Sequence, residues 1–192
     1  MNVMTRILVI YASTHGQTAK VAGALAETLR RCGAHVDLDE ARRTARAPDA
    51  YDAVIVAASV HAGAYQKEIQ RWTRTHAAAL NRKPTAFVSV CLGVLQHEPQ
   101  VKRELESIVG RLLEATGWEP ATVKPVAGAL LYTRYNWFVR RLMKRIVAKA
   151  GGDTDTSRDY EYTNWADVRA FGEEFAARAM KRTEEGRALA IA

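Results

Sequence analysis

The sequence predicts an α/β fold: a doubly wound, five-stranded parallel sheet with helices on both faces. Short apolar runs of strand-like composition alternate with longer stretches of amphipathic helical periodicity, which is typical of βαβ units. The chain has 192 residues, enough for one domain to bury a sizeable core without disulfides or metals. We expect one domain over residues 1–182 and a flexible tail over residues 183–192.

The elements follow from this alternation in chain order. The first apolar run, RILVIY, is too short for a signal peptide and lacks a cleavage site, so it predicts a buried strand. Gly33 is placed to end the first helix, and Asp167 lies where a capping-box partner of Asn164 would start the last one. Strands are expected at 6–11, 35–39, 53–58, 85–91 and 122–130, and helices at 17–32, 67–80, 99–116 and about 164–182.

Composition excludes several classes of protein. Cys32 and Cys91 are far apart, and no Cys/His spacing resembles a zinc site, so neither a disulfide framework nor a structural metal is expected. No uncharged apolar run is long enough to span a membrane. Most of the net charge of +7 comes from residues 133–150, which hold six Lys or Arg and no acid. This local charge favours a specific surface over general nucleic-acid binding. The lack of an expected disulfide framework fits a reducing cytoplasm best.

In a doubly wound sheet, ligands bind at the carboxyl ends of the strands. The first such loop, ASTHGQTAKVA, offers hydroxyls from Ser13, Thr14 and Thr18, while Gly16 allows close approach to the backbone at a helix N-terminus. This pattern suits a phosphate monoester but matches neither a Walker loop nor G-x-G-x-x-G. A helix simply capped by Ser13 or Thr14 is an equal alternative at this point.

The loops after the third and fourth strands are small and sparsely charged. AASVHAGAYQKE contains Ser59, Gly63 and Tyr65 in a setting that lets a planar ring lie against backbone, and VSVCLGVLQHEP is apolar until Gln96. One phosphate cradle beside two flat walls describes a pocket for a mononucleotide with a planar base.

The phosphate loop resembles that of the flavodoxin-like fold, Ser/Thr-x-Thr-Gly-x-Thr, with His15 in place of the middle Thr. Further segments, YDAVIVAASVHAGAY, PTAFVSV, VAGALLYTRYNWF, GGDTDT and YTNWADVRAF, resemble the quinone-dependent protoporphyrinogen oxidase family over residues 6–178. The resemblance implies FMN, with its phosphate held by Ser13, Thr14, His15, Gly16, Gln17 and Thr18. It places the isoalloxazine against Ser59, Val60, His61, Gly63, Tyr65, Val90, Cys91, Leu92 and Gly93.

Two features depart from the pattern expected for that family. His61 and Ala62 stand where a basic residue and an aromatic residue are expected, and residues 93–99 are less basic than expected. His61 is a weak candidate for moving protons near the flavin, and a solvated loop histidine is an equal alternative. For Cys91, packing is favoured over chemistry.

The stretch LLYTRYNWFVRRLMKRIVAKAGG, residues 130–152, is absent from plain flavodoxins. A helix from about Tyr135 would place Phe138, Met143 and Val147 on one half and the basic residues on the other. Its simplest interpretation is a surface helix packed on the sheet, and the alternative is contact with substrate or with an anionic membrane surface. The residues expected at that contact are Arg134, Tyr135, Trp137, Arg140, Arg141, Lys144 and Arg145.

The resemblance implies an FMN-dependent oxidoreductase that converts protoporphyrinogen IX to protoporphyrin IX and passes electrons to a membrane quinone. Such an enzyme would lie on the inner face of the cell membrane, and a homodimer is left open. A flavodoxin-type electron carrier is an alternative, although such carriers are expected to be acidic and this chain carries +7. An NAD(P)H-quinone reductase lacks support from any dinucleotide fingerprint, and a flavin-free phosphate-binding module is the weakest alternative.

Overall fold

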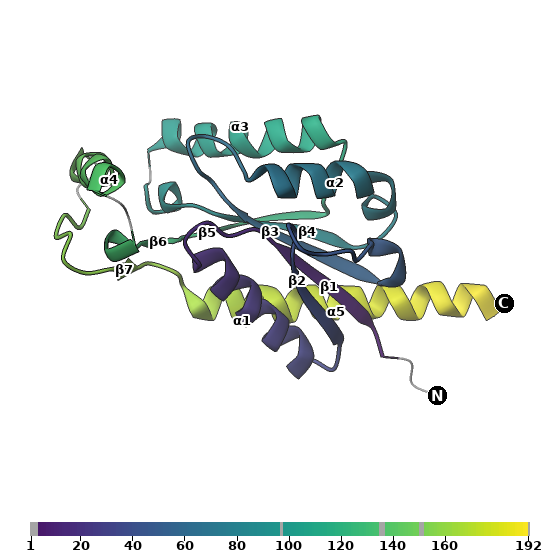
Figure 1. Cartoon of the computed structure of the whole chain (residues 1–192). Helices are drawn as coiled ribbons and strands as arrows, with labels where there is room; N and C mark the ends of the chain where they lie inside the picture. Colours follow the sequence, from purple (N-terminus) through teal and green to yellow (C-terminus); the bar gives the residue numbers. More distant parts are fainter. Residues whose placement is uncertain (1–3, 97, 135–136, 150–151, 192) are drawn as a thin grey trace.

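A computed structural model describes residues 4–96, 98–134, 137–149 and 152–191 of the chain. Its centre is a parallel sheet of five strands in the order β2-β1-β3-β4-β5, which confirms the predicted doubly wound topology (Figure 1). The strands are β1 (Arg6–Tyr11), β2 (His35–Glu40), β3 (Ala53–Ser59), β4 (Thr85–Val90) and β5 (Thr122–Val126).

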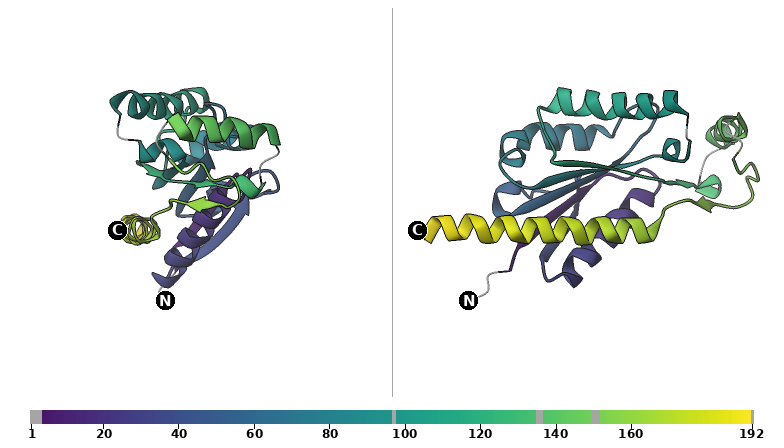
Figure 2. Two further views of the ribbon diagram at one scale, coloured as in Figure 1. Left: turned by 90° about the vertical axis from the view of Figure 1, so that its left-hand side faces the viewer. Right: turned by 180° about the vertical axis from the view of Figure 1, so that it is seen from behind.

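Helices cover both faces of this sheet, as the two views of Figure 2 show. On one face α1 (Gln17–Arg31) and α5 (Trp165–Ile191) pack together, and on the other lie α2 (Lys67–Leu80) and α3 (Pro99–Thr116). Neighbouring residues of β1 serve opposite faces, because Ile7 and Val9 join the first core while Leu8 and Ile10 join the second.

The first helix ends as expected, whereas the last helix differs from expectation at both ends. Gly33, at φ 94°, follows the end of α1 as predicted. Asn164 accepts the N–H of Asp167 at 3.1 Å, but the Asp167 carboxylate bonds Lys124, so only half of the capping box forms. The helix runs to Ile191 instead of ending near residue 182, because residues 183–191 are mostly helix-favouring and contain no proline. The flexibility of this tail stays a prediction.

The fifth predicted strand is two elements. β5 ends at Val126, where the N–H of Cys91 makes the last bond to it, and β6 (Ala129–Leu130) pairs instead with β7 (Tyr160–Glu161). Gly128 lies at the break, and its carbonyl accepts the N–H of Tyr162 at 3.1 Å. The chain therefore leaves the main sheet after Val126, and the last two residues of the predicted strand, Ala129 and Leu130, belong to a second, smaller sheet.

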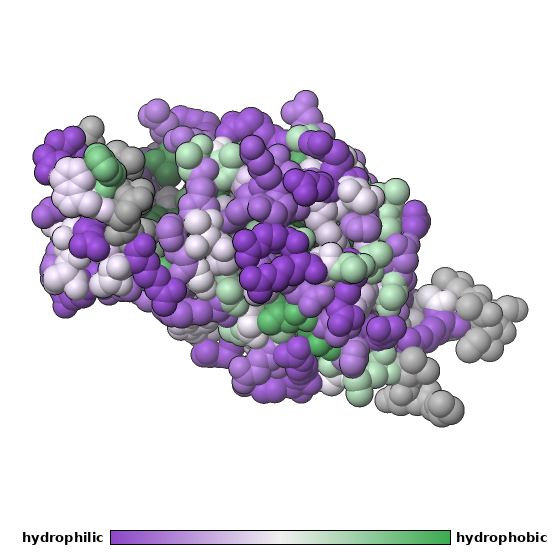
Figure 3. Space-filling model, in the orientation of Figure 1, coloured by the Kyte–Doolittle hydropathy of each residue, from purple (hydrophilic) through white to green (hydrophobic). Residues whose placement is uncertain are grey.

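Residues 127–163, which we call the insertion, form a small lobe beyond the carboxyl ends of the strands (Figure 1). The lobe contains β6, the 3-10 turn η3 (Tyr132–Arg134), the basic helix α4 (Trp137–Lys149) and β7. It has its own apolar core of Leu130, Leu131, Tyr132 and Val147. Figure 3 shows the surface hollowed between this lobe and the main body, with apolar residues inside the hollow.

Candidate functional site

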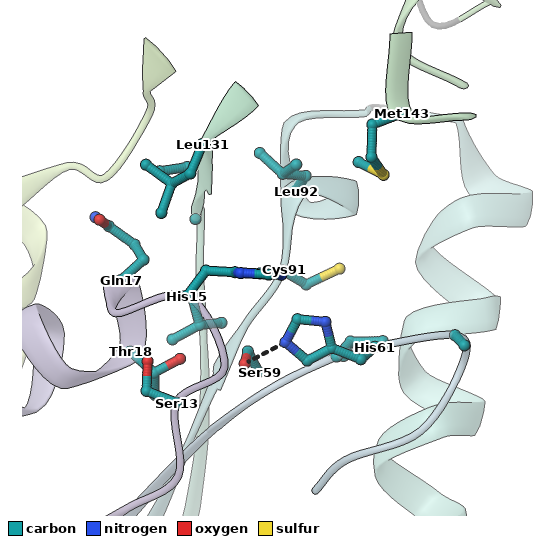
Figure 4. A pocket seen from close by; sticks show the side chains of 15 residues that line it. Ser13, His15, Gln17, Thr18, Ser59, His61, Cys91, Leu92, Leu131 and Met143 are labelled. Atoms are coloured by element: carbon teal, nitrogen blue, oxygen red, sulfur yellow. Dashed lines mark hydrogen bonds between the residues drawn. The ribbon is translucent and has the colours of Figure 1, made fainter. Parts of the chain in front are cut away.

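A pocket of about 270 Å³ lies at the carboxyl ends of β1, β3 and β4, where the sheet order reverses (Figure 4). It brings together the first, third and fourth strand loops, as the sequence predicts. No described residue of its lining carries a carboxylate, so an anionic ligand meets no like charge from these residues. The lining residues are Ser13, His15, Gln17, Thr18, Ser59, Val60, His61, Ala62, Val90, Cys91, Leu92, Gly128, Ala129, Leu131 and Met143.

The first loop turns sharply into α1 at Gly16, which has a φ of 97° and is the N-cap. The interpretation of Ser13 or Thr14 as N-cap is therefore wrong, because neither side chain occupies that position. Ser13 Oγ instead accepts the N–H of Gly16 at 3.0 Å, while Thr14 Oγ1 accepts Nε2 of Gln66 at 3.3 Å. The first turn of α1 has no acidic residue and no side-chain cap, so its N–H groups and positive dipole end suit an anion.

Gln17 is an anchor as well as a pocket residue. Its side chain is buried, and Nε2 donates to Thr163 Oγ1 at 2.8 Å, tying the loop to the residue where the insertion ends. Oε1 of Gln17 is buried without a hydrogen-bond partner among the described residues. A buried acceptor of this kind is a place where a ligand hydroxyl would compensate for lost water.

The loop after β3 places His61 beside the first loop. His61 Nε2 and Ser59 Oγ are 3.0 Å apart, and Gln66 Nε2 donates to the same hydroxyl at 2.8 Å. Burial first, and then nearby His15, lowers the pKa of His61. The backbone turns through Ala62, at φ 48°, and Gly63, at φ 75°. Two successive left-handed residues present His61 toward the pocket, as Figure 4 shows.

The loop after β4 forms the opposite wall. Cys91 Sγ accepts the N–H of Gly93 at 3.3 Å, which starts the short turn η2 (Leu92–Leu95), and burial raises the pKa of this thiol. A protonated, partly buried thiol fits the packing role favoured for Cys91. Val60, Cys91, Leu92 and Met143 also line a second cavity of about 400 Å³, to which Gly63 and Gly93 contribute.

Tyr65 lies away from the pocket, although the sequence suggests that it faces a planar ring. Its side chain is buried in the core, its ring packs edge-on against Phe87, and its hydroxyl hydrogen-bonds Ser89 Oγ at 2.7 Å. Among the predicted site residues, Thr14, Gly16, Gly63, Tyr65 and Gly93 are thus outside the lining of the first pocket.

Sequence reasoning missed the wall that the insertion supplies. Gly128, Ala129, Leu131 and Met143 all line the pocket, and Met143 comes from α4. The only signal for these residues was the family-like block that begins at Gly128, because small and apolar side chains carry no recognisable ligand chemistry. The insertion is therefore part of the pocket.

The basic segment is divided between two surroundings. Arg134 Nη1 donates to the carbonyl of His15 at 3.0 Å, so this residue reaches the first loop. Trp137 and Phe138 are 65 % and 77 % exposed, so at this end of α4 the apolar half of the helix faces solvent and does not pack on the main body. Their rings contact edge-on at 4.8 Å, and Arg141 lies over the Trp137 ring at 5.9 Å.

The other predicted contact residues lie on α4. Arg141, Lys144 and Arg145 are exposed, whereas Arg140 is half-buried. Tyr135 lies outside the described residues. Within the described ranges, no helix is both long and apolar enough to cross a membrane.

Comparison with known proteins fits this architecture. A family model described as a flavodoxin domain matches residues 8–157. The protoporphyrinogen IX dehydrogenase [quinone] of Escherichia coli strain K12 is 33 % identical over 172 residues, covering 89 % of this chain and 94 % of that protein. The chain belongs to this family of flavodoxin-domain proteins. A Leishmania major member is 32 % identical over 177 residues, covering 90 % of this chain and 75 % of that protein.

Solved structures support the fold assignment. A flavodoxin from the domain Archaea has a TM-score of 0.55 at 12 % identity and covers 91 % of this chain and 99 % of its own. Oxidised flavodoxin 1 from Bacillus cereus has a TM-score of 0.55 at 15 % identity, covering 90 % and 98 %. Membership of the protoporphyrinogen IX dehydrogenase family confirms the predicted oxidoreductase class, and the flavodoxin domain implies a flavin.

The residues present fit a flavin. The uncapped start of α1 and Gly16 suit a phosphate, and the orphaned Oε1 of Gln17 suits a hydroxyl-bearing chain. The apolar walls and the adjoining second cavity provide flat space for a ring system. A flavin that carries a phosphate uses all three features, whereas a flavin-free phosphate ligand leaves the apolar space unfilled.

Proposed function

We propose that this flavin oxidoreductase binds FMN and oxidises protoporphyrinogen IX to protoporphyrin IX, passing the electrons to a membrane quinone. The observation that carries the proposal is the wall formed by Leu131 and Met143, because the insertion joins the phosphate loop in a single pocket. The 33 % identity with the Escherichia coli protein extends over 89 % of the chain, so it includes most of this insertion as well as the flavodoxin-like core.

FMN supplies the two-electron chemistry when bound, so six electrons require three cycles. The chain's own part is to bind and orient. The start of α1 holds the phosphate, and the apolar walls around Val60 and Leu92 position the ring system and exclude water from it. His61 is neutral above its lowered pKa and is hydrogen-bonded to Ser59, so it is placed to accept a proton at its ring nitrogen.

The exposed face of α4 is proposed to recognise the other partners. This helix carries the exposed Arg141, Lys144 and Arg145 beside the half-buried Arg140, and their charges suit porphyrinogen propionates or lipid phosphates. Trp137 and Phe138 project into solvent beside them, which is the composition of an interfacial helix. A lipid-soluble acceptor is reached from such a surface, so we place the protein at the inner face of the cell membrane.

The direct test is an anaerobic assay. FMN-loaded protein is mixed with protoporphyrinogen IX and a menaquinone analogue, and porphyrin fluorescence is followed against three controls that omit the protein, the FMN or the quinone. We expect fluorescence to rise faster than in every control, with several porphyrins formed per protein. A rate equal to autoxidation would refute the proposed substrate.

The electron-carrier alternative makes a different prediction in the same system. A carrier would accept electrons in two separate one-electron steps from a reductase and would form no porphyrin. The NAD(P)H-quinone reductase alternative requires rapid bleaching of the flavin by NADPH. Neither result is expected, because the chain has a net charge of +7 and no dinucleotide fingerprint.

A further inference from the structure

Among the described residues, three hydrogen bonds join the insertion to the beginning of α1. Gln17 Nε2 bonds Thr163 Oγ1 at 2.8 Å, and Lys20 Nζ bonds Glu161 Oε2 at 3.0 Å. The third contact is Arg134 Nη1 to the His15 carbonyl at 3.0 Å, across 119 positions of sequence. All three lie within the loop and first turn of one helix, so the insertion docks on the first loop as well as on Leu92 of the loop after β4, which packs against its apolar core.

Of these three contacts, the one made by Arg134 brings a positive charge to the N-terminus of α1. Its Nη1 atom is 3.1 Å from the position that a Cβ on Gly16 would occupy, which places the guanidinium directly over the N-cap of α1. That end of the helix has no acidic residue and no side-chain cap. A dianionic phosphate at the helix start would therefore lie close to a full positive charge in addition to the helix dipole.

The turn that carries Arg134 is held firmly from within the insertion. Thr133 donates its N–H and its hydroxyl to the two carboxylate oxygens of Asp159, at 2.9 and 2.8 Å. Tyr132 is fully buried, and its hydroxyl donates to the carbonyl of Asp153 at 2.9 Å. The backbone of the turn is thus held by the folded insertion, and α4 begins at Trp137, three positions after Arg134 in the sequence.

We propose that Arg134 is a positioning residue for the flavin phosphate, so that binding of the phosphate and docking of the insertion stabilise each other. This inference rests on the proposed flavin site, and it assigns Arg134 to the cofactor instead of to the substrate. Coupling of this kind is reciprocal: a docked insertion strengthens phosphate binding, and bound phosphate holds the insertion against the pocket. Bound phosphate would then also hold Met143 of α4 more firmly in its place at the pocket wall.

The test compares FMN with riboflavin, which has the same ring and ribityl chain but no phosphate. Dissociation constants are measured by flavin fluorescence for the wild type, Arg134→Gln, Arg134→Lys and Arg158→Gln. Arg158 is a matched control, because it is an exposed arginine of the same insertion that pairs with Asp155. We expect Arg134→Gln to weaken FMN by about tenfold, the size of one partly exposed charged hydrogen bond, and to leave riboflavin unchanged.

Arg134→Lys keeps the charge and should recover most of the lost FMN affinity, while Arg158→Gln should bind both flavins as the wild type does. An equal loss for FMN and riboflavin in Arg134→Gln, or FMN binding within twofold of the wild type, would overturn the inference. A wild-type protein that binds neither flavin would refute the flavin site of the proposed function itself.

Limited trypsin digestion measures the reciprocal effect, since α4 carries cleavage sites from Arg140 to Lys149. FMN should slow cleavage within α4 in the wild type, riboflavin should slow it much less, and in Arg134→Gln the two flavins should act alike. Cleavage of wild-type α4 at the same rate with and without FMN would contradict the coupling.

Discussion

The rings of His15 and His61 lie edge to face in the pocket, with centroids 5.7 Å apart and planes at 67°. They come from the loops after β1 and β3, so the meeting of these loops brings two titratable groups together. Burial is the main cause that lowers the pKa of each ring; Arg134 adds to the effect on His15, and His15 adds to that on His61.

The two histidines should make the folded state sensitive to acid. A histidine whose pKa is lowered by folding binds fewer protons in the folded than in the unfolded chain below its ordinary value of 6.5. Its stabilising effect is therefore complete above that value and is lost as the pH falls through the lowered pKa. We expect the urea midpoint to fall between pH 7.5 and 5, and His61→Gln to reduce that fall. An unchanged pH dependence in the variant would show that His61 does not couple to folding.

The variant Tyr65→Phe tests whether Tyr65 stabilises the core or contributes to the pocket. The Tyr65 hydroxyl and Ser89 Oγ are hydrogen-bonded at 2.7 Å in a buried setting, so removing one hydroxyl leaves the other without this partner. We expect a loss of about 1–2 kcal/mol in the free energy of unfolding and an unchanged dissociation constant for FMN. Ser89→Ala and the double variant complete a mutant cycle that isolates the pair. Weaker FMN binding by Tyr65→Phe would instead return Tyr65 to the site.

Tyr65 also illustrates what sequence patterns leave undecided. Buried strands such as β1 and β3 are predictable because their central runs, residues 7–10 and 53–58, are apolar throughout and must be covered on both faces. The turn into α1 is predictable because hydroxyls and a glycine precede a helical pattern, whereas its binding of a phosphate stays a prediction. The side on which a loop tyrosine lies depends on a partner 24 residues away, and no local pattern encodes that choice.

The pairing of the two-residue strands β6 and β7 was missed for a related reason, because residues 129–130 were expected to continue the fifth strand of the main sheet. Each is too short to show an alternation, and they pair across the whole of α4. That pairing closes the lobe from which Leu131 and Met143 line the pocket and Arg134 reaches the first loop. The wall that the insertion supplies therefore follows from tertiary structure, although the amphipathic helix within it is visible in the sequence.

Two glycines of α5 should respond in opposite ways to a methyl group. A Cβ on Gly172 would lie 3.0 Å from Thr28 Cγ2 in the contact with α1, whereas a Cβ on Gly186 would have nothing within 4 Å. We expect Gly172→Ala to destabilise the protein by about 1–3 kcal/mol through overpacking. Gly186→Ala should be neutral or stabilise the helix by up to about 1 kcal/mol. Thermal unfolding of both variants tests this, and equal effects would contradict the close packing of α1 on α5.

The exposed aromatic pair allows a test of the proposed membrane contact that is independent of the basic residues. Trp137 and Phe138 are adjacent, 65 % and 77 % exposed, and followed by basic residues along α4. An interfacial helix inserts apolar rings below the lipid headgroups and keeps its cations at the phosphate level. If α4 works in this way, ring insertion should persist at high salt, while attraction between charges should be screened.

We therefore expect two separable losses in sedimentation with vesicles containing phosphatidylserine. Replacing Arg140, Arg141, Lys144 and Arg145 with Gln should weaken binding at low salt by at least tenfold, since each cation near an anionic surface contributes about 1 kcal/mol. Trp137→Ser with Phe138→Ser should abolish the salt-resistant fraction and the blue shift of tryptophan emission. As a control, Arg42→Gln with Arg43→Gln removes two exposed charges that are distant from α4 in the sequence. This variant should leave the salt-resistant fraction of vesicle binding intact. Binding unaffected by both sets of α4 variants would mean that this helix is a solvated surface, and the quinone would then have to be reached elsewhere on the protein.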